Sequence, residues 1–490
     1  MRNIGLSVPS LTVGVRWGAV GWGVRRGRKN GERPLKLGCG LKPGPTRHGF
    51  GAVVSACLRM AVRGLESRPK PLPAVAARLV ALLFVAGGLF GQFADKQQQV
   101  ASFEKVWTTI RDKHWQKNPG GLDWQAIHGE FYPRIENAKS DEEALAIMRE
   151  MLGRLKQTHF GIFPAAVFND LDSEGGGDGS AGIDARVLDG KVVVTDLDPG
   201  SPSAKAGVKR GWIIQSVNAK PLTPAIEKLK SDPEIHEMAL ERAVHTRLTG
   251  LPGDTIRVEF LDGANAPVTM NLGLVQERGQ TARFGNLPPM HVFFETKRIG
   301  NTGYVRFNMF LDLVRVMAGF GSAVEGCMKC DGFIIDLRGN PGGIAGMAMG
   351  MAGWLVDKPD ERLGAMYLRD ATLNFVINPR AEVFAGPVAI LVDGTSASTS
   401  EIFAGGLQDL GRARVFGTKT AAAALPSIFE RLPNGDGFQY ATANYISEGG
   451  KALEGLGVTP DVEVKLTREG LLAGHDAVLD AALEWIRKKK

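Results

Sequence analysis

The chain has 490 residues, of which 44% are hydrophobic and 23% are charged, proportions that exclude a disordered, collagen-like or multi-span membrane protein. Its net charge of +7 is uneven, because residues 1–59 hold 11 Lys and Arg and only one acidic residue, Glu32. The remainder carries 48 basic and 51 acidic residues, a net charge of −3. The basic balance therefore belongs to the N-terminal segment, and no nucleic-acid partner is expected.

The N-terminal part reads as two segments. Residues 1–59 are rich in Gly and Arg without a sustained apolar period, so we expect them to be unstructured or absent from the mature protein. In residues 60–95, basic residues precede the apolar run Leu79–Phe90. A run of this length suits a signal peptide and is short for a membrane span. We expect export to the periplasm, the cell envelope or the medium. The alternative is retention as an N-terminal anchor, and membrane contact is expected through this segment alone.

Cysteine usage gives little chemistry. Beyond the N-terminal segment the chain has only Cys327 and Cys330, a lone C-x-x-C pair. A structural zinc site needs four ligands, and no second pair has matching spacing. Free buried thiols or a local disulfide are the two readings that remain, and no metal or cofactor is predicted.

The next two regions differ in the spacing of their apolar residues. Residues 96–170 show apolar residues at helical spacing up to about Phe163, with a start signal at Ser140, and predict a helical domain. Residues 177–275 change to short alternating runs with hairpin turns such as Asp189-Gly190, and predict a β-rich domain.

In residues 276–490 strands alternate with helices, which predicts an α/β domain. Strands are expected at Tyr304–Asn308, Phe333–Arg338, Val388–Val392, Ala413–Phe416, Gln439–Ile446 and Val462–Lys465. Helices are expected at Gly346–Val356, Ser400–Leu410 and Leu471–Arg487.

Three junctions carry residues suited to catalysis. A buried strand runs into the glycine-rich turn Asp336-Leu-Arg-Gly-Asn-Pro-Gly-Gly343, whose uncovered amides could receive a ligand oxygen. A second strand ends in the Ser/Thr cluster before Ser398, where a helix begins. The pattern Ser398-Thr-Ser-Glu401 fits a capping box, but a helix N-terminus also favours developing negative charge beside a nucleophile. The third junction is Thr158-His159, which follows an amphipathic helix.

Residues 177–275 resemble a PDZ domain through the stretches GIDARV, VVTDLDPGSPSAKAGVKRGWIIQSVN and LPGDTIRVEF. The resemblance implies peptide capture, with the amides around Gly182 and Ile183 holding a chain-terminal carboxylate while the peptide adds to the sheet edge. A packing module that binds no peptide is the alternative.

The whole span from about 100 to 487 resembles the C-terminal processing (tail-specific) serine peptidases. The stretches DLRGNPGG, TSASTSEIFAGGLQDLGRA and EGLGVTPDVEV carry the resemblance. It implies a ClpP/crotonase-like core that hydrolyses peptide bonds, with Ser398 as nucleophile and the amides of Gly343 and Thr399 as oxyanion hole.

One position departs from the better-known branch of that family, which uses a Ser/Lys dyad. Here the lysine position is Ala423, which cannot accept a proton. The chain is more similar to the tricorn-core branch, in which a Ser-His pair and a glutamate act with the distant serine. On that pattern His159 maps as general base, Thr158 replaces the serine before it, and Glu454 maps as the group that orients the histidine.

The sequence thus predicts an exported serine endopeptidase acting on protein or peptide substrates, with C-terminal tails as ligands of the PDZ-like domain. The alternatives are an inactive peptide-binding or scaffold protein of the same fold and, less favoured, acyl-CoA chemistry on a crotonase-like core. The oligomeric state cannot be read from the sequence.

Overall fold

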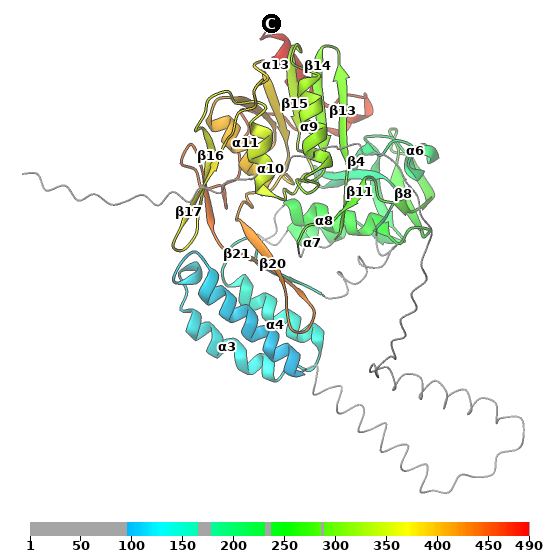
Figure 1. Cartoon of the computed structure of the whole chain (residues 1–490). Helices are drawn as coiled ribbons and strands as arrows, with labels where there is room; N and C mark the ends of the chain where they lie inside the picture. The colour runs from blue at the N-terminus through cyan, green and yellow to red at the C-terminus, as the bar shows by residue number, and fades with distance from the viewer. Residues whose placement is uncertain (1–95, 165–177, 231–236, 286–288, 490) are drawn as a thin grey trace, which may run out of the picture. The chain divides into compact units, whose positions relative to one another are not determined.

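The computed structural model describes residues 96–164, 178–230, 237–285 and 289–489 (Figure 1). All of them lie in one compact unit, Ala81–Lys490. The N-terminal segment 1–59 and the predicted signal segment 60–95 lie outside the described residues. Within the described ranges, no helix has both the length and the hydropathy to span a bilayer.

The N-terminal region is helical, as predicted. Residues 96–113 form a helix, and they are followed by η1 (Pro119–Gly121), α3 (Trp124–Glu136) and α4 (Asp141–Gly153). Ser140 caps α4, since its hydroxyl accepts the Glu143 amide at 3.1 Å. The helical prediction runs too far, however. Residues Gly161–Phe163 form strand β1, which pairs with β21 (Gly437–Ala441) of the C-terminal region.

The main sheet of the β-rich region has the strand order β3-β4-β5-β8-β9, and the short strand β6 (Lys220–Pro221) pairs with β5. The strands of the main sheet are β3 (Ile183–Leu188), β4 (Lys191–Leu197), β5 (Ile213–Val217), β8 (Thr255–Leu261) and β9 (Pro267–Gly273). A small second sheet has the order β10 (Val275–Gln276), β2 (Gly179–Ser180), β7 (Thr249–Gly250). Helices α6 (Pro202–Ala206), α7 (Thr223–Lys230) and α8 (Glu237–Leu248) accompany them, and apolar residues of α8 join the same core. Strand β3 is an edge of the main sheet, which matters for peptide binding.

The C-terminal region holds a six-stranded sheet in the order β13-β14-β15-β18-β19-β23, parallel from β14 onward. The strands are β13 (Phe294–Ile299), β14 (Thr302–Phe307), β15 (Gly332–Asp336), β18 (Val388–Val392), β19 (Ala413–Gly417) and β23 (Val462–Glu463). Apolar residues of α9 (Arg315–Glu325), α10 (Ala345–Ala352) and α11 (Thr399–Asp409) pack on one face. Helix α13 (Ala477–Arg487) packs on the other face, which gives three layers (Figure 1).

Two predicted elements are interrupted. The expected strand Gln439–Ile446 is two strands, since β21 ends and β22 (Asn444–Ser447) leaves to pair with β16 (Arg362–Tyr367). The expected helix Leu471–Arg487 is also two, α12 (Arg468–Leu472) and α13. Gly474 between them adopts a positive φ of 82°, a conformation that ends a helix. Asp476 then caps α13 by accepting the Leu479 amide at 3.1 Å.

Several elements were not predicted from the sequence: β13, β16, β17 (Thr372–Val376), β20 (Ser427–Arg431) and α9. The structure also decides between the two readings of the cysteine pair, because Cys327 and Cys330 form a disulfide. This bond lies just after α9 and is absent from the candidate site described below.

Candidate active site

Ser398 lies at a sharp turn between β18 and α11. Its backbone has φ 53° and ψ −116°, a region that non-glycine residues rarely adopt and that often marks functional turns. The turn is held by close packing. A Cβ on Gly342 would lie 2.7 Å from the Ala397 carbonyl oxygen and 2.8 Å from the Ser398 Cβ. The sequence therefore places glycine where a second backbone must touch the serine turn.

Glu401 holds this turn from inside the protein. Its buried carboxylate accepts the amides of Ser398 and Ala423, each at 3.0 Å. It also accepts the Thr420 hydroxyl at 2.6 Å and the Ala422 amide at 2.9 Å. Burial raises the pKa of Glu401 to about 7, against the lowering effect of these hydrogen bonds. The Ser398–Glu401 pattern is thus a capping box whose carboxylate also fixes the segment around Ala423.

The two residues predicted to form the oxyanion hole are in contact. The Thr399 hydroxyl donates to the Gly343 carbonyl at 2.8 Å. Gly343 has φ 139°, and a Cβ there would lie 2.2 Å from the Phe310 carbonyl oxygen. In the described part of the chain, neither the Gly343 amide nor the Thr399 amide donates a hydrogen bond. Two uncommitted amides beside a serine can stabilise an oxyanion.

Thr158, His159 and Glu454 are also brought together, although 296 positions separate Thr158 from Glu454. The Thr158 amide donates to Glu454 Oε1 at 2.8 Å, and its hydroxyl donates to Oε2 at 2.9 Å. The same hydroxyl lies 2.7 Å from His159 Nδ1. The carboxylate, the hydroxyl and the imidazole thus form one continuous hydrogen-bonded relay.

The backbone of His159 has φ 61°, in the left-handed region that histidine tolerates better than most residues. The ring is half-buried. Removal of water from around it lowers the pKa of His159 to about 4. The imidazole is therefore neutral at pH 7, as a general base must be.

A short segment links the relay to the serine turn. Ala423 accepts the Ser398 amide at 2.8 Å through its carbonyl, and the next amide, Ala424, donates to Glu454 Oε2 at 3.1 Å. His159 and Ser398 themselves share no hydrogen bond in the described residues. Ala423, the position at which the sequence resemblance expects a lysine, thus lies directly against the serine turn and is 2% exposed.

The predicted peptide-binding residues lie at the start of the edge strand β3. Gly182 has φ 74°, and its amide donates to Ser180 Oγ at 2.9 Å. A carboxylate bound at Gly182 would therefore have to displace this hydroxyl. Ile183 begins β3 and pairs with Leu197 of the neighbouring strand β4.

Asn340 is a residue of the site that sequence reasoning missed. Its side chain is fully buried, and its Oδ1 accepts the Gly342 amide at 2.9 Å. Its carbonyl accepts the Ala397 amide at 3.1 Å and the Ser400 hydroxyl at 2.9 Å. It therefore ties the glycine-rich turn to the serine turn. A polar residue within the glycine-rich turn that follows a buried strand was the available signal.

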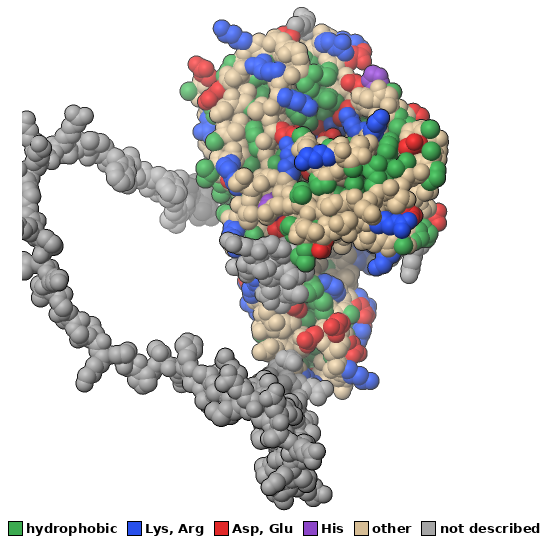
Figure 2. Space-filling view, turned by 90° about the vertical axis from the view of Figure 1, so that its right-hand side faces the viewer, with side chains coloured by type: hydrophobic (Ala, Val, Ile, Leu, Met, Phe, Trp, Pro, Cys, Tyr) green, Lys and Arg blue, Asp and Glu red, His purple; other side chains and the backbone are tan. Residues whose placement is uncertain are grey.

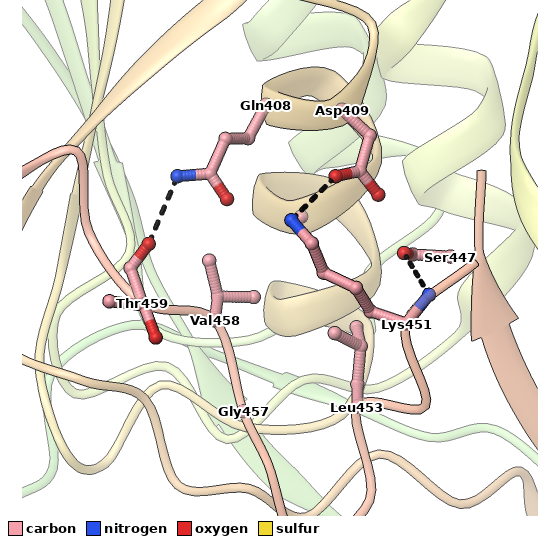
Figure 3. Close-up of a pocket in the computed structure, with 9 residues that line it drawn as sticks. Gln408, Asp409, Ser447, Lys451, Leu453, Gly457, Val458 and Thr459 are labelled. Carbon is pink, nitrogen blue, oxygen red and sulfur yellow. Dashed lines mark hydrogen bonds and ion pairs between the residues drawn. The ribbon is translucent and has the colours of Figure 1, made fainter. Parts of the chain in front are cut away.

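Asp409 lies at the far end of α11 from Ser398, in a cavity of about 190 Å³ (Figure 3). Its carboxylate pairs with Lys451 Nζ at 3.0 Å and accepts the Gly449 amide at 2.9 Å. Beside it, Gln408 donates to the Thr459 carbonyl at 3.0 Å. These contacts hold the 447–459 segment, which contains Glu454, against the helix. They fit a structural role for Asp409.

Two parts of the chain match models of known protein families. Residues 301–464 match the model of peptidase family S41, and residues 96–153 match the model of the tricorn protease C1 domain. The C-terminal region is thus similar to family S41 peptidases and the helical region is similar to the tricorn C1 domain, in agreement with the resemblance in the sequence.

The curated relatives are C-terminal processing proteases. The chain is 25% identical to the carboxy-terminal-processing protease of Bartonella bacilliformis over 330 residues, which are 63% of this chain and 66% of that protein. It is 26% identical to the carboxyl-terminal-processing protease of a Picosynechococcus species over 79% of this chain and 88% of that one. The chain spans just under two thirds of the length of the first relative.

Solved structures show the same fold. The photosystem II D1 C-terminal processing protease aligns with a TM-score of 0.52 and 23% identity, over 78% of this chain and 98% of that chain. Mature CPAF aligns with a TM-score of 0.55 and 13% identity, over 81% and 96%. The predicted α/β fold with a helical N-terminal region is confirmed. Together these matches make the chain similar to C-terminal processing proteases over most of its described length.

Proposed function

We propose that this chain is an exported serine endopeptidase that hydrolyses peptide bonds in proteins or peptides, with Ser398 as nucleophile and His159 as base. The observation that carries the proposal is the Glu454–Thr158–His159 relay, assembled from segments distant in sequence. It supplies what Ala423 cannot, namely a base held in a fixed orientation.

Proton counting gives the relay a direction. The Thr158 hydroxyl has one proton, and an ionised carboxylate only accepts, so Thr158 donates to Glu454. The oxygen of that hydroxyl then accepts a hydrogen bond from the N–H at His159 Nδ1. Nε2 of His159 is left unprotonated. This tautomer has its basic nitrogen on the side of the ring away from Thr158, which is the form that a general base requires.

The mechanism follows from these positions. His159 Nε2 accepts the proton of Ser398 as its Oγ attacks the substrate carbonyl, and the amides of Gly343 and Thr399 stabilise the oxyanion. Loss of one such donor typically costs about 2.7–4 kcal/mol. His159 then protonates the leaving amine, and water releases the acyl group by the reverse sequence. Approach of His159 to Ser398 accompanies substrate binding, since catalytic hydrogen bonds are often long without substrate.

The β-rich region serves as a PDZ-like domain that receives C-terminal tails. The support is the edge position of β3 and the positive φ of Gly182 at its start. One further contact supports a role in access to the site: Met238 of α8 packs against Ala397, Ala421 and Ala423, which surround the serine turn. In this proposal the domain delivers chain ends to Ser398 and limits entry until a peptide is bound.

Export rests on the segment 60–95 and is tested separately. Expression of the full chain in a bacterial host with a periplasm, followed by fractionation and N-terminal sequencing, should yield a mature protein that begins after Gly88, Gly91 or Ala94. A full-length chain in the cytoplasmic fraction would overturn export and leave the peptidase proposal standing.

The activity is tested by incubating the chain with casein and identifying new peptide termini by mass spectrometry. Ser398→Ala should abolish their formation, whereas Ser322→Ala, at an exposed serine of α9, should not. EDTA should have no effect. A folded wild type that cleaves nothing but binds C-terminal peptides would favour the inactive binding protein, and thioester hydrolysis or CoA binding would favour the crotonase-type reaction.

A further inference from the structure

The loop that leads to Ser398 is organised by one carboxylate. Asp393 follows β18 directly, and its Oδ1 accepts the Thr395 amide at 3.0 Å and the Thr395 hydroxyl at 2.5 Å. The same oxygen accepts the Gly339 amide at 3.1 Å. Gly339 belongs to the glycine-rich turn that ends at Gly343. Asp393 thus joins the serine loop to the turn that carries an oxyanion amide.

The second oxygen of Asp393 is bound by a residue from the β-rich region. Arg186 of β3 donates from Nε to Asp393 Oδ2 at 3.2 Å, across 207 positions of sequence. Its guanidinium also lies against the backbone of Gly339, where an added Cβ would be 2.7 Å from Nη2. One side chain therefore touches both loops. Its own side chain is only 15% exposed, so these contacts are desolvated.

Arg186 lies in a cluster of opposite charges. Basic and acidic side chains gather close together on the face shown in Figure 2, and a cavity of about 130 Å³ is lined by groups of both signs. The charged groups of its lining are Arg186, Arg210, Lys297, Arg306, Arg338, Asp184, Asp196, Asp393 and Asp476.

Arg306 of the same lining offers an internal comparison. It bonds Asp196 at 2.7 Å and Asp184 at 3.0 Å. It therefore joins the C-terminal region to the β-rich region as Arg186 does. Within the described residues, however, Arg186 is the side chain that forms an ion pair with Asp393. Both arginines therefore hold the two regions together, but of the two it is Arg186 that contacts Asp393 and Gly339 of the loops beside Ser398.

We propose that Arg186 is a positioning residue for the reaction: through Asp393 and Gly339 it holds the serine loop and the oxyanion turn in register. This inference rests on the proposed peptidase activity. Removal of one partner of a buried pair leaves the other charge uncompensated, so Asp393 would draw water or turn away, and the two loops would lose their common anchor. Since Arg186 is on the edge strand β3, a peptide added there would pair with the strand that carries this anchor.

The test compares Arg186→Met with Arg306→Met in the full chain, each replacing a guanidinium with an apolar side chain. The measurements are the rate of Ser398 labelling by a fluorophosphonate, kcat and KM for a short peptide, and the melting temperature. Displacement of a catalytic group can cost on the order of 100-fold. We expect Arg186→Met to lower labelling and kcat by about tenfold or more with little change in KM, and Arg306→Met to lower mainly the melting temperature.

Each outcome has a defined meaning. Equal losses of kcat in the two variants, in proportion to the melting temperature, would reduce Arg186 to a docking contact and overturn the proposal. So would full labelling in Arg186→Met. If that variant does not fold, Arg186→Lys is the deciding variant, because lysine keeps the positive charge but lacks the planar guanidinium with its several N–H donors. It should then label several-fold more slowly than wild type while retaining its melting temperature. A wild type that does not label at all would overturn the peptidase proposal itself and this inference with it.

Discussion

In the proposed mechanism, the contact between Thr158 and His159 decides how Ser398 is activated. The Thr158 hydroxyl oxygen makes both side-chain hydrogen bonds of the relay, one with Glu454 and one with His159 Nδ1. A serine at this position would keep both side-chain hydrogen bonds, because the hydroxyl makes them. The same atom fixes the tautomer, so its removal should impair catalysis while leaving the histidine in place.

Thr158→Val removes this hydroxyl with almost no change in shape. We expect kcat for a short peptide to fall by about 10–100-fold, within the range of general-base contributions, because Nδ1 loses its acceptor and the ring its orientation. Thr158→Ser should retain most activity. Steady-state kinetics with circular dichroism as a folding control would show this, and equal kcat for the valine and serine variants would contradict the relay.

The pKa of His159 predicts the acid limb of the pH profile. Burial lowers this pKa from 6.5 to about 4, so the neutral base persists well below pH 6.5 and is lost only as the pH falls through about 4. The rate of fluorophosphonate labelling should therefore decline near pH 4. The labelling rate should change a second time near pH 7, where Glu401 titrates, since its pKa is raised to about 7. Glu401→Gln should remove this second change in rate. An acid limb at 6.5 would mean that the ring is hydrated.

At the scale of elements, the site is built from turns that follow buried strands. Strand β15 leads to the glycine-rich turn and β18 leads to Ser398, and both strands run parallel in one sheet. Their carboxyl ends therefore meet at the same edge. This explains why the two motifs, 55 positions apart between Gly343 and Ser398, come into contact.

Gly342→Ala tests this close approach. The new Cβ would lie 2.7 Å from both the Ala397 carbonyl oxygen and the Thr399 nitrogen, so the serine turn would have to move. Gly190 is the matched control, since its φ of 81° is similarly unfavourable but nothing lies within 4 Å of an added Cβ. We expect labelling of Ser398 to fall by about 100-fold in Gly342→Ala and to stay unchanged in Gly190→Ala. Similar rates in both variants would show that the turn tolerates the crowding.

In the proposed function, helix α8 is the element that limits access to the site. Met238 is the residue of this helix that packs on Ala397, Ala421 and Ala423. Met238→Ala should loosen this cover and raise the rate of casein cleavage by about two- to fivefold, with a smaller effect on a dipeptide ester, since proteins need more room to reach the site. Kinetics with both substrates would measure this. A fall in both rates would indicate that Met238 supports the site instead of covering it.

Helices and strands with a strong local sequence pattern were predicted, and those without one were missed. The buried strands β15 and β18 and the start of α11 were predicted because continuous apolar runs end in Gly or Ser/Thr signals. Strand β13 was missed, since Phe294–Ile299 is half-exposed and carries Lys297 and Arg298. The break between β21 and β22 depends on partners in different sheets, which no local pattern reports.

The site residues divide in the same way. Ser398 and Gly343 lie in specific motifs and were assigned from them, whereas the proximity of Glu454 to Thr158 was only implied by a resemblance. Asn340, Asp393 and Arg186 were missed because their importance comes from hydrogen bonds between segments far apart in sequence. An arginine in a β-strand usually faces solvent, and nothing local distinguishes this one.

At the scale of the whole molecule, three regions meet around Ser398. In the proposed mechanism the helical region supplies His159, the β-rich region supplies Arg186 and Met238, and the C-terminal region supplies the nucleophile and the oxyanion amides. A site divided in this manner is complete only when all three are docked, so movement between them can control the reaction. In the proposed mechanism the base comes from another region, so activity does not require a lysine at the position of Ala423.

The most direct test of this account labels the full chain with a fluorophosphonate and maps the adduct by mass spectrometry in wild type, His159→Ala and His128→Ala. His128 is the matched control, since it also bonds a carboxylate, with its Nε2 2.8 Å from Glu104 Oε1, within the helical region. The account predicts an adduct on Ser398 in wild type and His128→Ala and none in His159→Ala. Labelling of Ser398 that survives in His159→Ala would contradict it.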